Sequence, residues 1–349
     1  MLYTTEMVFR GHPDKVCDQI SDAVLDECIK KDPNARVACE VIGGKNNIFI
    51  TGEISVEVDY ESIVKRVLSD IGYGADYEVI VDVSKQSPDI NLGTNDLVKG
   101  ASDQGMMFGY ACDETDEYMP LGYMLAKKMA TLYDEHRKIN SFLKPDGKCQ
   151  VTMEYKDDKP FRIHTIVFSH QHEDIEYDNT YVLDNIIKKV CGDYIDRSTI
   201  ILINPTSRFV LGGFKADSGL TGRKIIVDTY GSYAKHGGGA FSGKDSTKVD
   251  RTGAYILRKI AKNIVAKKMV SKIEIQISYC IGKQDPISIN FDTFNTNKVD
   301  LDVIRKYINT FDLRPHSIIE HLDLLKPIYE ESAQFGHFGN DTFPWEKID

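Results

Sequence analysis

The 349-residue sequence has no CxxC pair, no long uninterrupted apolar run and no excess of basic residues. Without a long apolar run it lacks a candidate membrane span, and its first residues, MLYTTEMVFRGHPDK, lack the charged and apolar blocks of a signal peptide. The seven scattered cysteines are typical of reduced intracellular thiols. A net charge of −10 argues against nucleic acid, whose backbone requires a basic face. We therefore expect a cytoplasmic protein with neither nucleic acid nor a membrane as partner.

Three segments repeat one pattern of two strands followed by a helix. The strands read ARVACEVI and NIFITGEISVEV, then CQVTMEY and FRIHTIVFS, then KIEIQISYC and PISINFD, and the helices are expected at about 60–71, 181–191 and 300–310. The repeat predicts an α+β fold of three ββα-type domains related by a pseudo-threefold axis, each a sheet covered by helices on one face. The second face of each sheet must also be buried, against another sheet or against another subunit.

Domain boundaries follow from these repeats. We expect an N-terminal domain at 1–93, a central domain at 101–214 and a C-terminal domain at 216–346. The stretch QSPDINLGTNDLVKGASDQG at 86–105 is rich in Gly, Asn, Asp and Ser, which is typical of a long loop. Within it, residues 88–102 are predicted to form a mobile lid.

The stretch from 212 to 251, GGFKADSGLTGRKIIVDTYGSYAKHGGGAFSGKDSTKVDR, combines glycine with Lys, Arg and Asp. Glycines let backbone N–H groups approach an anion, cations neutralise phosphate, and aspartates hold hard metal ions. The mixture predicts a site for a polyphosphate and its metals. A flexible solvated loop stays open as the alternative.

A P-loop is a second alternative for this stretch. Gly238 to Lys244 has P-loop spacing, but Asp245 stands where Ser or Thr should ligate magnesium. The apolar run at 224–227 also ends about ten residues before the place where a P-loop strand should end. These departures favour an anion-binding loop of another kind.

Several candidate residues are ambiguous from local pattern alone. His12 and Asp14 stand at the start of an amphipathic helix expected over about 14–30, where an acidic residue is favourable in any case. Glu40 and Glu53 fall in strand-like runs and are compatible with outward, solvated positions. Lys148 follows a Pro-Asp-Gly turn and is compatible with a plain turn lysine.

Eight motifs taken together closely resemble S-adenosylmethionine synthetase, also called methionine adenosyltransferase. They are GHPDKVCDQISDAVLD at 11–26, TGEI at 51–54, QSPDI at 86–90, DQGMMFGYACDET at 103–115, LKPDGKCQVT at 143–152, SRFVLGG at 207–213, DSGLTGRKIIVDTYG at 217–231 and HGGGAFSGKDSTKVDR at 236–251. The resemblance extends from residue 3 to FGHFGNDTFPWE at 335–346. Among the departures, Ser102 replaces a usual Gly, and Asp245-Ser246 replaces a common Asp-Pro.

The resemblance implies an enzyme that makes S-adenosylmethionine from ATP and L-methionine. Methionine sulfur attacks C5′ of ATP, and the triphosphate is then hydrolysed to pyrophosphate and phosphate. A thioether needs no general base, which agrees with the absence of a recognisable nucleophile–base triad, so catalysis depends on positioning and electrostatics. The resemblance also implies two Mg2+ ions and K+ as cofactors, and a homodimer with active sites at the interface, often paired into a tetramer.

The resemblance assigns roles to individual residues. The catalytic positions are His12, Lys148, Arg223, Lys224 and Lys244. The ATP-binding positions are His12, Asp146, Lys148, Arg208, Phe209, Asp217, Arg223, Lys224, Ala240 and Lys244. The methionine-binding positions are Glu53, Gln86, Asp217 and Lys248, and Asp103 lines the site. The magnesium carboxylates are Asp14 and Asp250, and Glu40 is the potassium position.

Two other functions are alternatives to this interpretation. A nucleotide triphosphatase or kinase would need a P-loop and an acceptor site, and Asp245 argues against the P-loop. A regulatory subunit without catalysis would be expected to have lost metal carboxylates or clamp lysines, and this sequence keeps them.

Overall fold

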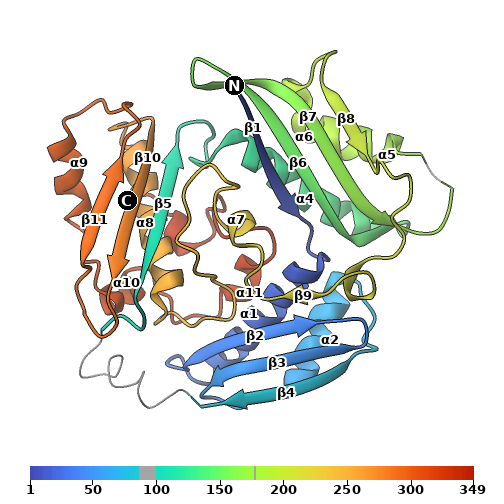
Figure 1. The fold of residues 1–349 in the computed structure, drawn as a ribbon, viewed down its shortest axis with the longest axis horizontal. Helices are drawn as coiled ribbons and strands as arrows, with labels where there is room; N and C mark the ends of the chain where they lie inside the picture. Colours follow the sequence, from blue (N-terminus) through green and yellow to red (C-terminus); the bar gives the residue numbers. More distant parts are fainter. Residues whose placement is uncertain (86–99, 177) are drawn as a thin grey trace.

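The computed structural model describes residues 1–85, 100–176 and 178–349. Figure 1 shows three small sheets arranged around a central region that contains α7. Each sheet is covered by helices on one face and carries no barrel closure within the described ranges. The predicted α+β fold of three sheet-and-helix domains is therefore confirmed.

The helices and strands fall into three units along the chain. The first unit holds β1 (Leu2–Val8), α1 (Pro13–Lys31), β2 (Val37–Gly43), β3 (Asn47–Ile54), α2 (Tyr60–Ile71) and β4 (Glu78–Ser84). The second holds β5 (Gly105–Cys112), α4 (Leu121–Ile139), β6 (Leu143–Lys156), β7 (Lys159–His172), the helical turns α5 (Thr180–Val182), η1 (Leu183–Ile187), α6 (Lys188–Cys191) and η2 (Gly192–Tyr194), and β8 (Ile200–Ile203). The third holds η3 (Gly213–Lys215), β9 (Gly219–Leu220), α7 (Ile225–Asp228), α8 (Val249–Ala266), β10 (Lys272–Tyr279), β11 (Ser288–Asp292), α9 (Leu301–Ile308), α10 (Pro315–His321), α11 (Tyr329–Ser332) and η4 (Pro344–Glu346).

Each unit gives its first strand to a sheet formed mainly by another unit. The strand orders are β1-β6-β7-β8, β5-β10-β11 and β9-β2-β3-β4. Strands β1, β5 and β9 each pair antiparallel with the first strand of a hairpin from another unit. The exchange runs in a closed cycle, from the first unit to the second, the second to the third, and the third to the first. The domain boundaries at 1–93, 101–214 and 216–346 stay a proposal, since every sheet draws on two of these segments.

The repeated core agrees with the predicted pattern of two strands and a helix. Helix α2 spans the predicted 60–71, with an Asp59 side-chain cap at its start and Gly72 in the left-handed region at its end. Helix α9 is also present. The helix predicted at 181–191 contains a five-residue π-helical segment, η1, in its middle.

Helix α1 begins at Pro13, within one residue of the predicted start at about 14. Its first turn carries Asp14 of the candidate site. Its apolar residues at four-residue spacing are fully buried, which fixes the helix against β2 and β9. Four aspartates of α1 are buried as well: Asp14, Asp18, Asp22 and Asp26. Because buried carboxylates require hydrogen-bond donors, these four residues must be paired with other parts of the fold.

The sheet faces turned away from the helices keep apolar side chains in contact with solvent. Ile42 on β2 is 45% exposed, and Glu40 stands two residues before it on the same face. Ile200 and Leu202 on β8 are 47% and 42% exposed. One chain by itself therefore leaves part of these sheet faces exposed to solvent.

The predicted lid at 88–102, together with Gln86, lies mostly outside the described residues. Its described end is tied to the loop before β11, since the Ala101 N–H donates to the Lys283 carbonyl at 2.8 Å and the Gly282 N–H donates to the Ala101 carbonyl at 2.8 Å. No helix within the described ranges is long and apolar enough to cross a membrane.

Candidate active site

The first cluster of site residues gathers around the start of α1 and consists of His12, Asp14, Lys148, Arg223 and Lys224. Asp14 is almost fully buried, and its Oδ2 lies 2.6 Å from Nζ of Lys224. Its Oδ1 lies 3.5 Å from Nε of Arg223. The Oδ1 atom also accepts the N–H of Leu220 at 3.0 Å. The structure therefore brings together a carboxylate and two cations that are far apart in the sequence.

His12 is the N-cap of α1, and its Nδ1 accepts the N–H of Asp14 at 3.2 Å. Burial and then the nearby Lys224 lower the pKa of His12, Asp14 opposes them, and the net pKa is about 4. The imidazole is therefore neutral at physiological pH. Because Nδ1 accepts a hydrogen bond, Nε2 carries the ring proton and is available as a donor.

Lys148 joins this cluster from β6. Its Nζ lies 2.7 Å from Oε2 of Glu6 on the neighbouring β1, and Gln150 donates to the same oxygen at 3.1 Å. Burial raises the pKa of Glu6, but the hydrogen bonds from Lys148 and Gln150 outweigh it and the net shift is downward. Glu6 was not among the predicted residues, because its approach to Lys148 depends on the long-range pairing of β1 with β6.

The other predicted ATP-binding residues near the first cluster are paired with residues outside it. Asp146 is buried and accepts the N–H of Gly213 at 2.8 Å. Burial raises its pKa to about 6, with Asp217 among the groups that raise it, whereas the N–H groups of two glycines oppose the shift. Asp217 is exposed, lies near enough to act on His12 electrostatically, and accepts the N–H of Ser218 at 2.8 Å. Arg208 pairs with Asp174 at the surface, and the Phe209 N–H donates to His172.

The second cluster consists of Glu40, Lys244, Lys248 and Asp250. The Lys244 Nζ lies 2.7 Å from Oδ2 of Asp250, which stands in the first turn of α8. Lys248 is the N-cap residue of the same helix, and its side chain has no partner in the part of the chain that the structure describes. Glu40 keeps solvent contact, yet surrounding protein partly desolvates it and raises its pKa, with Lys244 opposing and Asp18 adding to the rise.

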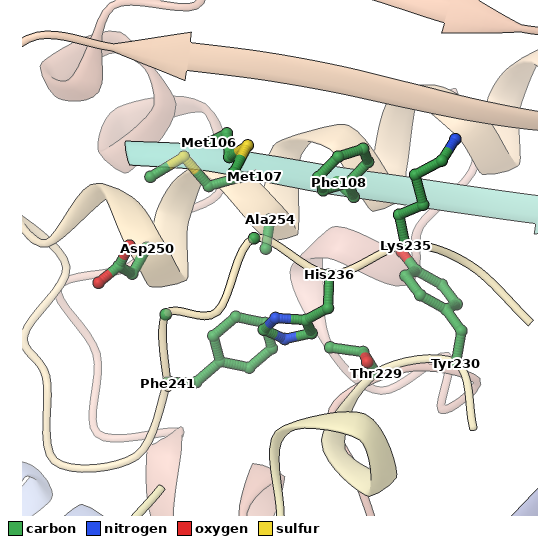
Figure 2. Close-up of a pocket in the computed structure, with 12 residues that line it drawn as sticks. Met106, Met107, Phe108, Thr229, Tyr230, Lys235, His236, Phe241, Asp250 and Ala254 are labelled. Atoms are coloured by element: carbon green, nitrogen blue, oxygen red, sulfur yellow. The ribbon is translucent and has the colours of Figure 1, made fainter. Parts of the chain in front are cut away.

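The glycine-rich loop of the second cluster packs directly on Asp250. A Cβ at Gly239 would lie 2.3 Å from the Asp250 carboxylate, so only glycine permits this approach. Figure 2 shows a small pocket beside it, lined by Met106 and Phe108 of β5 and by the rings of His236 and Phe241. The loop thus places apolar and aromatic surface next to the Asp250 carboxylate and the Lys244 that pairs with it.

The remaining predicted residues lie around this second cluster. Asp103 is exposed two residues before Gly105, where an added Cβ would approach Asp250 at 3.5 Å. Ala240 follows Gly239, and its Cβ lies near the backbone of Gly222, which connects this loop to the first cluster. Glu53 stands on β3 opposite Ala38 of β2, and its side chain has no partner within the described ranges. Gln86 lies outside them.

Asp245 has a structural role that a P-loop serine could not fill. It is buried, its Oδ2 accepts the N–H of Val37 at 2.7 Å, and its Oδ1 accepts the N–H of Thr247 at 2.8 Å. The segment at 225–228 that a P-loop would need as a strand is the short helix α7. The structure therefore agrees with an anion-binding loop of a kind other than a P-loop.

The two clusters offer three lysine–carboxylate pairs and a neutral histidine donor. Within the described residues, no hydrogen bond or ion pair joins a side chain of one cluster to a side chain of the other. No group of three or more metal-ligating side chains comes together there either. Since Mg2+ commonly takes one or two carboxylates and completes its shell with phosphate oxygens and water, the lone carboxylates of Asp14 and Asp250 fit metal ions that arrive with a polyphosphate.

Comparison with protein families identifies the family of this chain. Three family models match the chain in order: the S-adenosylmethionine synthetase N-terminal domain at residues 1–91, the central domain at 98–209 and the C-terminal domain at 211–347. The chain belongs to the S-adenosylmethionine synthetase family.

Two curated relatives extend this result across the chain. The S-adenosylmethionine synthase of Sorangium cellulosum (strain So ce56) is 50% identical over 99% of this chain and 87% of its own length. The S-adenosylmethionine synthase of Clostridium tetani (strain Massachusetts / E88) is 48% identical over 99% of this chain and 97% of its own length. Both the first and the second cluster of the site therefore lie inside the region shared with S-adenosylmethionine synthetases.

Proposed function

We propose that this chain synthesises S-adenosylmethionine from ATP and L-methionine, by attack of the methionine sulfur on C5′ of ATP, and then hydrolyses the triphosphate to pyrophosphate and phosphate. Membership of the S-adenosylmethionine synthetase family supports the overall reaction. One structural observation carries the mechanism: Lys224, Arg223 and a neutral His12 converge beside Asp14. This set of groups suits a triphosphate leaving group, which needs charge stabilisation and no base.

The cations perform the electrostatic part of the reaction. As the C5′–O bond breaks, negative charge accumulates on the triphosphate, and Lys148, Arg223 and Lys224 stabilise that charge from fixed positions. The Nε2–H of His12 donates a hydrogen bond to an oxygen at the breaking bond. Each lysine is held by a carboxylate before substrate binds, which keeps its ammonium group in place at little entropic cost.

Asp14 and Asp250 would hold two Mg2+ ions, and Glu40 would hold K+. Bound cations of this kind neutralise the triphosphate oxygens and orient them. Asp14 and Asp250 each pair with a lysine, Lys224 and Lys244, so a Mg2+ ion at either carboxylate would lie beside a proposed phosphate ligand. Hard oxygen donors are the ligands that both kinds of cation prefer.

We further propose that each active site is shared by two subunits of a homodimer. The first cluster supplies the triphosphate side, and Glu40, Glu53, Lys244, Lys248 and Asp250 of the second subunit supply the rest. Two observations support the proposal: within the described residues no side-chain hydrogen bond or ion pair joins the two clusters, and the sheet face that carries Glu40 also exposes Ile42. An isologous contact through that face would bury apolar surface. It would also place the first cluster of each subunit against the second cluster of the other, which gives two equivalent sites.

The decisive experiment combines ATP and methionine with the purified protein. We expect S-adenosylmethionine, detected by mass, together with equal amounts of pyrophosphate and phosphate, and no phosphorylated acceptor. ATP hydrolysis that continues at the same rate without methionine would favour a general triphosphatase instead. ATP binding with no turnover in the presence of methionine and Mg2+ would favour a regulatory subunit.

A further inference from the structure

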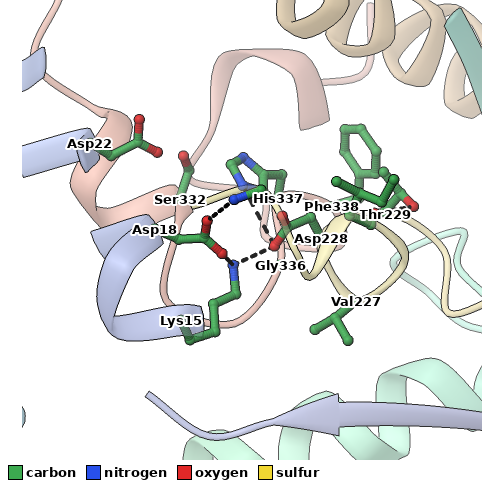
Figure 3. A network of polar contacts seen from close by, with 12 residues as sticks. Lys15, Asp18, Asp22, Val227, Asp228, Thr229, Ser332, Gly336, His337 and Phe338 are labelled. Carbon is green, nitrogen blue, oxygen red and sulfur yellow. Dashed lines mark hydrogen bonds and ion pairs between the residues drawn. The ribbon is translucent and has the colours of Figure 1, made fainter. Parts of the chain in front are cut away.

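Lys15, Asp18 and Asp228 form a fully buried ionic cluster (Figure 3). The Lys15 Nζ lies 3.1 Å from Oδ2 of Asp18 and also contacts Oδ1 of Asp228. Burial by itself lowers the pKa of Lys15, but the two carboxylates outweigh it and raise the pKa above its usual value. One buried cation thus bridges two carboxylates, and none of the three residues is among those assigned to substrate binding.

This buried cluster holds both ends of the segment from 222 to 228. At the start, Oδ1 of Asp18 accepts the N–H of Gly222 at 2.8 Å. At the end, Asp228 is the last residue of α7 and is bound by Lys15. Arg223 and Lys224, the cations proposed to stabilise the triphosphate, lie between these two fastened points.

The backbone at the start of the segment is closely packed. Gly222 has a φ of +79°, and a Cβ there would come within 2.7 Å of the Ala240 Cβ. Two residues earlier, the Leu220 N–H is bound by Asp14, one helical turn before Asp18 on α1. Two carboxylates on one face of α1 therefore fasten the turn that leads into Arg223 and Lys224.

We infer that Asp18 is a positioning residue for the cationic part of the active site: with Lys15 and Asp228, it fixes the 222–228 segment and so aims Arg223 and Lys224 at the triphosphate. This inference rests on the proposed function for the identity of the anion. It concerns a residue that touches no substrate and acts through a backbone N–H group.

Asp26 provides a matched control on the same helix. It is also buried, and its carboxylate accepts the N–H groups of Tyr329 at 3.1 Å and Glu330 at 2.9 Å. Those donors belong to α11, not to the glycine-rich loops of the candidate active site. Asp18→Asn and Asp26→Asn therefore make the same chemical change at two buried positions of one helix, although only Asp18 also pairs with a lysine. Only the first change is expected to loosen the cationic segment.

The test compares both variants in Tm, in kcat and KM for ATP and methionine, and in the binding of inorganic tripolyphosphate with Mg2+ by calorimetry. Asparagine has one acceptor oxygen, so Asp18→Asn cannot satisfy both Gly222 and Lys15. We expect both variants to lose Tm. Asp18→Asn should also lose on the order of 10- to 100-fold in kcat and in tripolyphosphate affinity, with the KM for methionine little changed. Asp26→Asn should keep the kcat and the tripolyphosphate affinity of the unaltered protein.

A double-mutant cycle with Lys224→Met tests whether Asp18 acts through the cation. If it does, the losses of tripolyphosphate affinity in Asp18→Asn and Lys224→Met are less than additive in the double variant. Asp228→Asn, which loosens the other end of the segment, and Lys15→Arg, which keeps every charge, provide second tests if Asp18→Asn does not fold. Equal losses of affinity in the Asp18 and Asp26 variants, or full additivity in the cycle, would overturn the inference. Tripolyphosphate binding is measured without methionine, so this contrast stands even if no S-adenosylmethionine is made.

Discussion

Lys224 and Asp14 form an ion pair with 2.6 Å between Nζ and Oδ2, although 210 positions separate them in the sequence. Lys244 and Asp250 repeat the arrangement at 2.7 Å in the second cluster. In each pair the lysine is a proposed phosphate ligand and the aspartate a proposed magnesium ligand. Each pair thus sets one positive charge against one negative charge and holds the proposed phosphate ligand beside the proposed magnesium ligand.

Removing either carboxylate should impair the use of magnesium. We expect Asp14→Asn and Asp250→Asn each to lower kcat on the order of 100-fold and to raise the Mg2+ concentration needed for half-maximal rate. Asp184→Asn, which removes an exposed carboxylate paired with Lys188, serves as the control and should change neither value. Rates close to those of the unaltered enzyme at limiting Mg2+ in both active-site variants would contradict the metal assignment.

Replacing Asp245 with serine restores the P-loop consensus and so tests that interpretation directly. We expect Asp245→Ser to destabilise the protein by about 1–3 kcal/mol, because the buried N–H of Val37 loses its acceptor. ATP affinity without methionine should not improve. Urea denaturation and calorimetry measure the two quantities, and tighter ATP binding in the variant would revive the P-loop alternative.

The neutral state of His12 should make its contribution to stability depend on acid pH. Its folded pKa of about 4 lies below the unfolded value of about 6.5. As the pH falls, the unfolded chain binds the proton first, so this stability is fully present above about pH 6.5 and is lost towards pH 4.

His12→Asn removes this titration and keeps an oxygen that can cap α1. Its free energy of unfolding, measured by urea denaturation, should therefore fall less than that of the unaltered protein between pH 7 and pH 4.5. An identical pH dependence in the two proteins would show that His12 is not held neutral by the fold.

Complementation tests the site shared between subunits. Lys224→Met and Glu53→Gln each inactivate a different half of the site, so a mixed dimer carries one doubly altered site and one intact site. After refolding at equal ratio, about half of the dimers should be mixed and activity should recover to roughly a quarter of the unaltered level, if the sites act independently. Refolding each variant alone is the control. Absent activity despite confirmed subunit mixing would rule out the shared site.

The helices and hairpins could be predicted because each is marked by a pattern within a few neighbouring residues. Alternation at period two marks β2, β3, β6, β7, β10 and β11, and the four-residue apolar spacing together with a proline marks α1. The site motifs were also visible in the sequence, since glycine, lysine and aspartate gather within 212–251. What the sequence could not indicate was which of these charged residues touch one another.

The chain's own residues determined the repeated units, the glycine-rich loop and the family. Only the tertiary structure decided that β1, β5 and β9 leave their own units, that Glu6 pairs with Lys148, and that Asp18 holds Gly222. Propensity and periodicity act over a few residues, whereas the hydrogen bond between Gln150 and Glu6 spans 144 positions and forms only when β1 of the first unit joins the sheet of the second unit. Such pairings depend on the burial of whole sheets and on satisfying every buried polar group at once, so they belong to the folded chain and not to any segment of it.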